Sequence, residues 1–194
     1  MNFLEERIAE SAIIKQDNVL KVDSFLNHQI DSVIVEQIGQ ELCRRFADAN
    51  ITKVLTIETS GIVIAYPIAR ALGVPLVVAR RSKSVNIDGD LYVAEIPSAT
   101  KKIAGRVMVS KKFIQSDDSV LVVDDILANG FTLQGLISII EAAEASVAGL
   151  GIAIEKGMQD GGYRLRNLGY RLESVAIVDT MDPKTGEITF RSEE

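Results

Sequence analysis

The chain has 194 residues, the length of one domain, and its 47% hydrophobic content is enough for a buried core. Its net charge of −6 argues against a general affinity for nucleic acid or for an anionic membrane. One cysteine, Cys43, excludes an internal disulfide framework, and the single histidine, His28, has no cysteine or histidine partner for a zinc site. No apolar run is long enough to span a membrane, and Glu5, Glu6 and Arg7 stand where a signal peptide needs an apolar run, so we expect a cytoplasmic protein.

The first eighty residues alternate between helical and strand patterns. In chain order we expect a helix over residues 2–12, a strand over 18–22 and a polar irregular stretch over 23–31. A helix over 32–48, a strand over 54–57, a helix over 62–72 and a strand over 76–79 should follow. Asp31 or Ser32 would cap the long helix, and Gly73 with Pro75 would end the next one. Strands that alternate with helices indicate a parallel α/β sheet with right-handed crossovers.

Residues 80–112 interrupt this alternation. We expect two strands there, near residues 91–96 and 106–109, joined by polar linkers. A long insertion at a ligand-binding edge of a sheet is also a candidate lid.

Basic residues are concentrated in this insertion, which has eight of them and only three acidic residues. Arg80, Arg81 and Lys83 leave the end of a core strand, so we expect them to bind an anion. Lys101 and Lys102 fit a solvated hairpin better.

The most informative stretch is residues 119–132. Val120 to Val123 form an unbroken apolar run, which is typical of a buried parallel strand. Asp124 and Asp125 follow it, then a short loop of small and polar residues from 128 to 132, and then apolar residues at helical spacing. The pattern predicts a strand that ends in two acids, a tight loop and a helix.

The last third continues the alternation. A strand over 148–154 would end at Glu155 and Lys156, so that the lysine points into the same crevice as the two acids. We expect a short helix over residues 161–168 and a last core strand over 175–179. A turn over 182–186 and a strand over 188–190 that pairs back should follow.

The chemistry of the central stretch follows from its order. In an open parallel sheet, ligands bind at the carboxyl ends of the strands, and the free N–H groups of a helix N-terminus suit a phosphate. Gly130 lets the backbone approach that phosphate, and Thr132 adds a hydroxyl donor. The paired acids would repel a phosphate but can accept hydrogen bonds from sugar hydroxyls. This combination indicates a ribose 5-phosphate; the alternative is a buried strand that ends in two N-capping aspartates.

The order of apolar run, acid pair, small residue, polar residue, Gly and Thr resembles the signature of the type I phosphoribosyltransferases, which bind 5-phosphoribosyl 1-diphosphate (PRPP). The resemblance implies the α/β fold of that family, a central, mostly parallel sheet flanked by helices. It also implies a single domain over residues 1–194, with a small hood from about 1–30 plus the C-terminal segment, and a flexible, lid-like hairpin insertion over about 80–112.

Three further stretches, residues 19–31, 56–62 and 149–156, resemble the bacterial xanthine phosphoribosyltransferases. This narrower resemblance implies an enzyme of purine salvage that transfers the 5-phosphoribosyl group of PRPP to nitrogen 9 of xanthine and releases diphosphate. It also implies a homodimer, no nucleic-acid or membrane partner, and Mg²⁺ held mainly by the diphosphate of PRPP rather than by a metal site of the protein.

The resemblance assigns roles to individual residues. The acid pair, Asp124 and Asp125, would face the ribose hydroxyls and stabilise a transition state of oxocarbenium character. The 5-phosphate would be bound by Ala128, Asn129, Gly130, Phe131 and Thr132. The diphosphate would be bound by the backbone N–H groups of Glu58, Thr59, Ser60 and Gly61, with Arg80 and Lys83 as basic partners. The purine would contact Leu20, Asn27 and Lys156.

Lys156 would read the exocyclic oxygen at purine position 6, because an ammonium only donates hydrogen bonds and therefore rejects an amino group. Each purine-contacting residue has a structural alternative: a surface lysine for Lys156, a turn residue for Asn27 and core packing for Leu20. Guanine and hypoxanthine share the 6-oxygen, so they remain alternative substrates. A non-catalytic regulator that senses PRPP is the alternative from another class, although the chain lacks the length and positive charge of an added DNA-binding domain.

Overall fold

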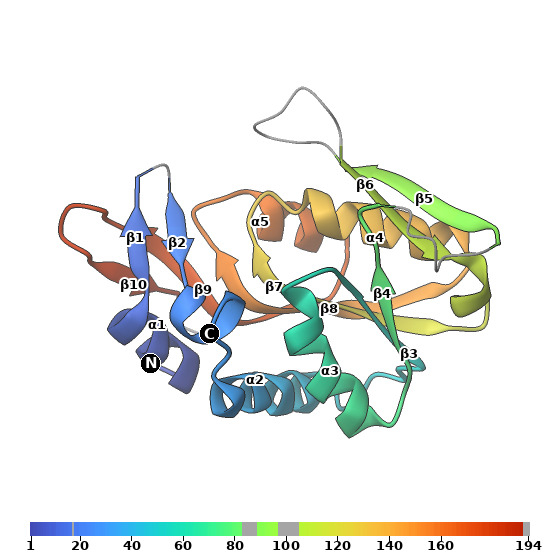
Figure 1. Ribbon diagram of the computed structural model, residues 1–194, viewed down its shortest axis with the longest axis horizontal. Helices are drawn as coiled ribbons and strands as arrows, with labels where there is room; N and C mark the ends of the chain where they lie inside the picture. Colours follow the sequence, from blue (N-terminus) through green and yellow to red (C-terminus); the bar gives the residue numbers. More distant parts are fainter. Residues whose placement is uncertain (17, 83–88, 97–104, 192–194) are drawn as a thin grey trace.

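The computed structural model describes residues 1–16, 18–82, 89–96 and 105–191. Its centre is a six-stranded sheet in the order β10-β9-β8-β7-β3-β4 (Figure 1). The strands are β3 (Lys53–Ile57), β4 (Leu76–Ala79), β7 (Ser119–Leu127), β8 (Ser146–Lys156), β9 (Leu172–Met181) and β10 (Ile188–Phe190). All neighbours pair in parallel except β10, which runs antiparallel to β9. The predicted α/β sheet is therefore confirmed.

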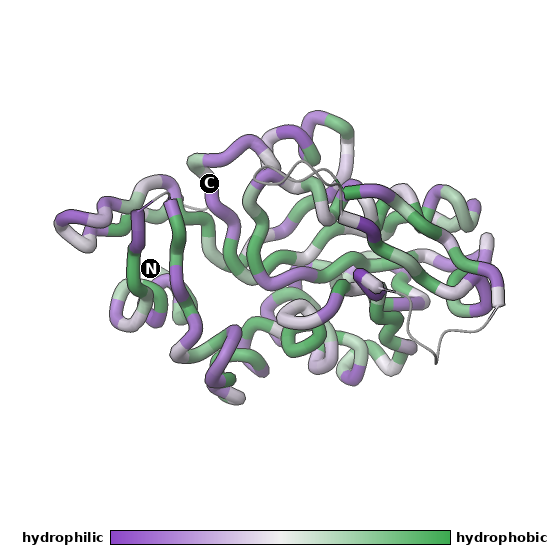
Figure 2. The backbone as a smooth tube through the Cα atoms, turned by 45° about the horizontal axis from the view of Figure 1, so that its top comes forward, coloured by the Kyte–Doolittle hydropathy of each residue, from purple (hydrophilic) through white to green (hydrophobic). Residues whose placement is uncertain are grey.

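Helices cover both faces of the sheet. They are α2 (Ser32–Arg45), α3 (Gly61–Leu72), α4 (Phe131–Ala142) and α5 (Gly161–Asn167). Leu121 and Val123 of β7 pack in one core cluster with α2 and α3, whereas Val120 and Val122 pack in a second cluster with α4. The strands are correspondingly apolar through the middle of the molecule (Figure 2). Burial of both faces explains why β7 reads as an unbroken apolar run. None of the helices in the described ranges is long and apolar enough to cross a membrane.

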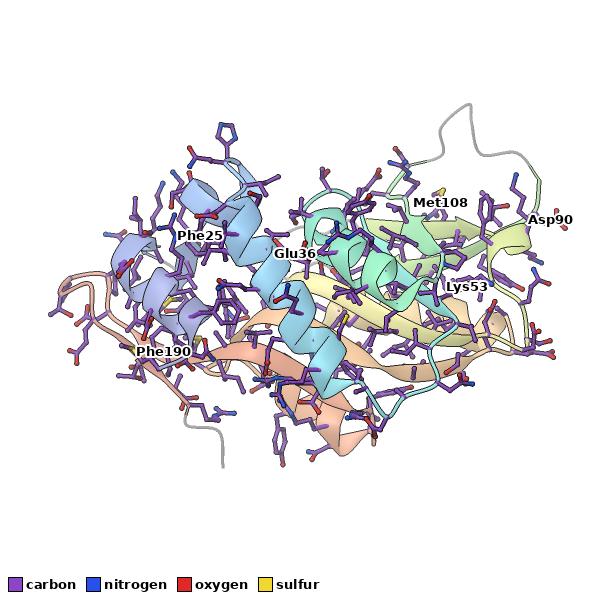
Figure 3. The ribbon with its side chains drawn as sticks, turned by 90° about the horizontal axis from the view of Figure 1, so that it is seen from below. Phe25, Glu36, Lys53, Asp90, Met108 and Phe190 are labelled. Carbon is purple, nitrogen blue, oxygen red and sulfur yellow. The ribbon has the colours of Figure 1, made fainter. Side chains whose placement is uncertain are left out.

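The N-terminal residues form a separate small group at one end of the sheet, beside β10 (Figure 1). It consists of α1 (Phe3–Ser11), the antiparallel strands β1 (Ile13–Lys15) and β2 (Val19–Lys21), and a π-helical turn, η1 (Asp23–Asn27). Phe25 is fully buried in the core cluster against which Phe190 packs, and both lie at this end while Lys53 lies toward the other (Figure 3). The first and last segments of the chain therefore share one core.

A two-stranded hairpin, β5 (Leu91–Ile96) and β6 (Gly105–Ser110), packs against α4 and follows the end of β4. The backbone N–H groups of Arg80 and Met108 donate to each other's carbonyls, at 3.0 and 2.9 Å. Both predicted strands of the insertion are thus present. Lys83, Lys101 and Lys102 lie outside the described residues.

Some element ends differ from the sequence-based expectation. α2 ends at Arg45, before the expected residue 48, and Asp31 rather than Ser32 is its cap, accepting from the N–H groups of Val33 and Ile34 at 3.1 and 3.3 Å. β7 continues to Leu127, so the acid pair lies inside the strand and not after it. The cause is the long partner strand β8, which pairs with β7 through Glu155.

Candidate active site

Two adjacent carboxylates occupy the carboxyl-end half of the central strand β7. Asp124 and Asp125 are each only 7% exposed, and the backbone N–H of Asp125 donates to Oδ1 of Asp124 at 3.1 Å. Burial first, and the negative charge of Asp125 second, raise the pKa of Asp124 well above its usual value, while the charge of Arg81 acts in the opposite direction. Asp124 is therefore poised to take up a proton, and both carboxylates can accept hydrogen bonds from a bound ligand.

The turn between β3 and α3 packs directly against this acid pair. The hydroxyl of Thr56 donates to the carbonyl of Val123 at 2.7 Å, which ties β3 to β7. A Cβ added at Gly61 would overlap the Thr56 hydroxyl and lie 3.0 Å from Oδ1 of Asp124. Only glycine lets the backbone of this turn come so close to the acids.

Glu58 opens the same turn and is held by β4 and the two arginines that follow it. Its N–H donates to the carbonyl of Ala79 at 3.1 Å, and its carboxylate accepts from Arg80 Nη1 and from the backbone N–H of Arg81, both at 2.7 Å. These contacts, with that of Arg80 the largest, lower the pKa of Glu58. The peptide bond between Glu58 and Thr59 is cis. The prediction that the Glu58 N–H binds the diphosphate is therefore wrong, because this donor is engaged with β4, and the predicted donors that remain are the N–H groups of Thr59, Ser60 and Gly61.

The loop from Ala128 to Thr132 joins β7 to α4. Gly130 has φ 75° and stands immediately before the first helical residue, and its carbonyl accepts the N–H of Gln134 at 3.0 Å. The loop is packed against α5, because a Cβ at Gly130 would lie 3.3 Å from Cα of Gly161. The left-handed backbone therefore turns the chain into the helix N-terminus that was predicted to bind a phosphate.

The N-terminal group reaches the ends of β7 and β8 through two hydrogen bonds. Asn27 donates from Nδ2 to Oδ2 of Asp125 at 3.0 Å, and Lys156 donates from Nζ to the carbonyl of Asn18 at 2.9 Å. Burial lowers the pKa of Lys156. Leu20, which lies between Asn18 and Asn27 in the chain, is 5% exposed and packs in the core.

The structure thus brings most of the predicted site residues to one edge of the sheet. Asp124, Asp125, Gly61 and Asn27 meet through the contacts above, and Arg80 joins them through Glu58. Lys156 joins through the N-terminal segment. For Lys83 the structure describes nothing.

The short helix α5 was predicted, but its place at this edge was not. Arg164 of α5 donates from Nη2 to the carbonyl of Asn129, and its guanidinium lies over the ring of Phe131 at 5.0 Å from the centroid. The adjacent glycines Gly161 and Gly162 were the available signal, because two glycines at a helix start mark a close approach of backbones.

The described residues include no group of three or more His, Cys, Asp or Glu side chains that could hold a metal ion. The carboxylate of Glu58 is engaged with Arg80 and Arg81, so Asp124 and Asp125 are the carboxylates considered for a cation here. Two carboxylates fit an ion such as Mg²⁺ that is held mainly through the phosphates of a ligand.

Another cavity, of about 1000 Å³, is lined by residues of α2, β8, β9 and α5, and among them are Glu155 and Gly157 on either side of Lys156. The arginines in its wall have carboxylate partners: Arg166 with Glu155 at 2.8 Å, Arg191 with Asp179 at 2.5 Å, and Arg44 and Arg45 with Glu41 at 2.7 Å. The cavity contains none of the predicted site residues.

Comparison with known proteins places this geometry in a family. Residues 21–167 match the phosphoribosyl transferase domain. The chain is 49% identical to a xanthine phosphoribosyltransferase of Lachnoclostridium phytofermentans over the full length of both. It is 51% identical to one of Bifidobacterium longum, over 98% of this chain and 100% of the relative, and 45% identical to one of Bacillus cereus, over 100% and 98%.

Solved structures share the fold. An adenine phosphoribosyltransferase of Thermoanaerobacter pseudethanolicus superposes with a TM-score of 0.75 at 21% identity, over 90% of this chain and 98% of that one. The enzyme of Giardia lamblia, solved with 9-deazaadenine, gives 0.76 at 24% identity, over 91% and 98%. The domain match and the full-length relatives together show that the chain belongs to the phosphoribosyltransferase family.

Proposed function

We propose that this enzyme converts xanthine and PRPP to xanthosine 5′-monophosphate and diphosphate, a reaction of purine salvage. Relatives of about half identity over the whole chain carry the name of this activity. The observation that carries the proposal at the level of residues is the hydrogen bond from Asn27 to Asp125, at 3.0 Å. It joins the side chain proposed to read the base to the acid proposed to read the ribose.

The PRPP half of the site would use backbone donors at two turns. The loop of Ala128, Asn129, Gly130, Phe131 and Thr132 would hold the 5-phosphate at the N-terminus of α4. The N–H groups of Thr59, Ser60 and Gly61 would hold the diphosphate, with Glu58 orienting Arg80 beside them and Lys83 as a further basic partner. Asp124 lies against the first turn at Gly61, and both acids precede the second turn in β7, so they would face the ribose hydroxyls.

The base half of the site would lie under the hood formed by the N-terminal group. An asparagine amide has two N–H donors and one carbonyl acceptor. Asp125 takes one donor of Asn27 and so fixes which way the amide points, leaving one donor and one acceptor for the base. Such a pair complements the neighbouring N–H and C=O groups of an oxopurine. Lys156 would donate to the 6-oxygen, and Leu20 would pack beside the ring.

The chemical step would exchange one bond at C1 of the ribose for another. The bond to the diphosphate oxygen breaks and its electron pair leaves with the diphosphate, while nitrogen 9 of xanthine bonds to C1 and gives up its proton to solvent water. Positive charge that develops on the ribose is stabilised by the carboxylates of Asp124 and Asp125. Mg²⁺, when bound, neutralises the departing diphosphate.

The proposal includes a homodimer. Large apolar side chains are exposed on the neighbouring helices α2 and α3, where Val33 is 64% and Tyr66 is 61% exposed, and Ile30 before α2 is 48% exposed. Exposed apolar groups of this kind mark contact surfaces. Light scattering coupled to size exclusion would give the mass of two chains, and a monomer at micromolar concentration would contradict it. The cytoplasmic location stays a prediction.

An ultraviolet assay with PRPP and Mg²⁺ tests the proposed function, with xanthine, hypoxanthine, guanine and adenine offered in parallel. A wide preference for xanthine is the expected result. A preference for guanine or hypoxanthine would keep the PRPP site and overturn the choice of base, since these bases share the 6-oxygen. PRPP binding without turnover of any base would favour the non-catalytic regulator.

A further inference from the structure

The loop proposed to hold the 5-phosphate carries no charged side chain, although a phosphate monoester has a charge of about −1.5 to −2 at neutral pH. The nearest acids in the chain, Asp124 and Asp125, add negative charge. A helix N-terminus contributes only about +0.5 charge. A cation from another element would offset the charge that the backbone N–H groups leave uncompensated.

Arg164 of α5 is a cation that contacts this loop directly. Its Nη2 donates to the carbonyl of Asn129, and its guanidinium lies 5.0 Å from the centroid of the Phe131 ring. Its Nε is buried and has no hydrogen-bond partner among the described residues. One side chain thus contacts the loop on both sides of Gly130, at Asn129 and at Phe131, and retains a buried donor beside it.

The short helix that carries Arg164 is firmly seated. A Cβ at Gly161 would come within 2.8 Å of the backbone of Asn129 and Gly130, so the helix start and the loop are in main-chain contact. Arg166, two residues further along α5, pairs with the buried Glu155 of β8 through two hydrogen bonds of 2.8 Å. This anchor leaves Arg164 little freedom to move away from the loop.

We infer that Arg164 is a positioning residue for the 5-phosphate: it holds the loop in its binding conformation and supplies the positive charge that the loop lacks. The inference rests on the proposed function for the identity of the phosphate, which is that of PRPP and of any ribose 5-phosphate. It assigns to α5 a role in substrate binding that is separate from base recognition by Lys156.

The test compares three variants of the full-length protein. Arg164→Met removes the charge and the donors but keeps a long apolar side chain, and Arg164→Lys keeps the charge without the planar fork. Arg171→Met is the matched control, because Arg171 also donates to a backbone carbonyl, that of Arg45 at 2.6 Å, and lies over a ring, that of Phe46 at 4.9 Å. Arg171 makes these contacts away from the loop.

Titration calorimetry with ribose 5-phosphate and with PRPP reads the effect without any base. We expect Arg164→Met to weaken both by about tenfold, the size of one charge-assisted contact, with Arg164→Lys in between. KM for xanthine at saturating PRPP should change less than about twofold, since base contacts are untouched. Arg171→Met should bind both phosphates as the unaltered chain does.

Wild-type affinity for ribose 5-phosphate in Arg164→Met would overturn the inference, and so would equal weakening in Arg171→Met, which would indicate a general loss of packing. Failure of the proposed function gives a different result. An unaltered chain that binds ribose 5-phosphate and PRPP but turns over no base would overturn the function, while the Arg164 comparison would still decide the inference.

Discussion

Nδ2 of Asn27 and Oδ2 of Asp125 lie 3.0 Å apart, although 98 residues separate them in the chain. The bond closes the hood onto the centre of the sheet. One N–H donor of Asn27 is thereby bound to the acid pair, so a substitution of either side chain removes a hydrogen bond of the other. Under the proposed function, this contact would couple base recognition by Asn27 to ribose recognition by Asp125.

Asn27→Ala should raise KM for xanthine by about tenfold or more, because hydrogen bonds to charged or fully engaged groups are worth roughly 1.5–3 kcal/mol. KM for PRPP should change less, since the loops that hold its phosphates are not touched. Steady-state kinetics with each substrate varied in turn measure both values. Gln29→Ala, an exposed change two residues away, is the control, and an unaltered KM for xanthine in Asn27→Ala would refute the role of Asn27.

Lys156→Met should likewise raise KM for xanthine by about tenfold, because the methionine keeps the stem and loses the donor. Burial lowers the pKa of Lys156, so the ammonium should lose its proton below the usual lysine range. Activity should therefore fall on the alkaline side, and this limb should be missing from the residual activity of the variant. Lys21→Met, which removes a partly exposed hood lysine paired with Asp23 at 2.6 Å, is the control and should keep both KM and the limb.

Most elements could be predicted from local signals in the sequence. Where a strand's bounds differ from the prediction, pairing with a neighbouring strand sets them. β4 and β5 have the predicted bounds, and α3 ends at Leu72 with the predicted Gly73 as its cap, whose φ is 68°. β7 and β8 run further than their apolar residues, because the parallel ladder between them carries polar residues as well. β1 was not predicted, because its three residues are too few to show a strand pattern in the sequence.

The parts of the candidate site that lie in one continuous stretch could be predicted from the sequence. The parts that form where two distant segments meet could not. The phosphate loop and the acid pair stand in one motif, and their order alone pointed to a ribose 5-phosphate. The contact of Asn27 with Asp125 and that of Arg164 with the loop depend on tertiary packing. No spacing rule links residues 98 or 35 positions apart, so only the structure could bring them together.

Asp124→Asn should make the ligand-free protein more stable at neutral pH while it lowers activity. The folded-state pKa of Asp124 is raised, so its contribution to stability is present below the unfolded value of 3.8 and is lost as the pH rises through the folded value. A neutral asparagine avoids this loss. A gain of about 1 kcal/mol would raise Tm by roughly 2–4 °C in a chain of this size.

Thermal unfolding of both proteins across pH measures the difference, which should shrink toward acid pH as Asp124 of the wild type becomes protonated. A variant that is no more stable than the wild type at any pH would contradict the account. Asp125→Asn complements it: removal of the neighbouring charge should lower the pKa of Asp124 and shift the acid limb of kcat/KM to lower pH.

Gly130→Ala should weaken PRPP binding, because φ is 75° there and the added Cβ would lie 3.3 Å from Gly161. Gly73→Ala is a matched control, since φ is 68° and nothing lies within 4 Å of its Cβ. Both changes should cost about 1–2 kcal/mol of stability for the left-handed backbone. Only Gly130→Ala should raise KM for PRPP; an equal rise in both variants would show that strain alone is responsible.

Two ion pairs have similar distances but differ in burial, so their contributions to stability should differ. Glu155 is 2% exposed and pairs with Arg166 at 2.8 Å, whereas Glu36 of α2 pairs with Arg70 of α3 at 2.7 Å with both side chains well exposed (Figure 3 labels Glu36). Arg166→Met leaves a buried carboxylate without its cation and should cost about 3–5 kcal/mol of the free energy of unfolding. Arg70→Met should cost less than about 1 kcal/mol, because water and salt screen the exposed pair.

Urea unfolding of the two variants and of the double variant Glu155→Gln, Arg166→Met measures these costs. The double variant should recover most of the stability, since glutamine needs no counter-charge and can still accept from the hydroxyl of Ser174, which donates to Glu155 at 2.5 Å. If the double variant were as unstable as Arg166→Met, packing of the arginine stem rather than the buried charge would hold α5 on β8.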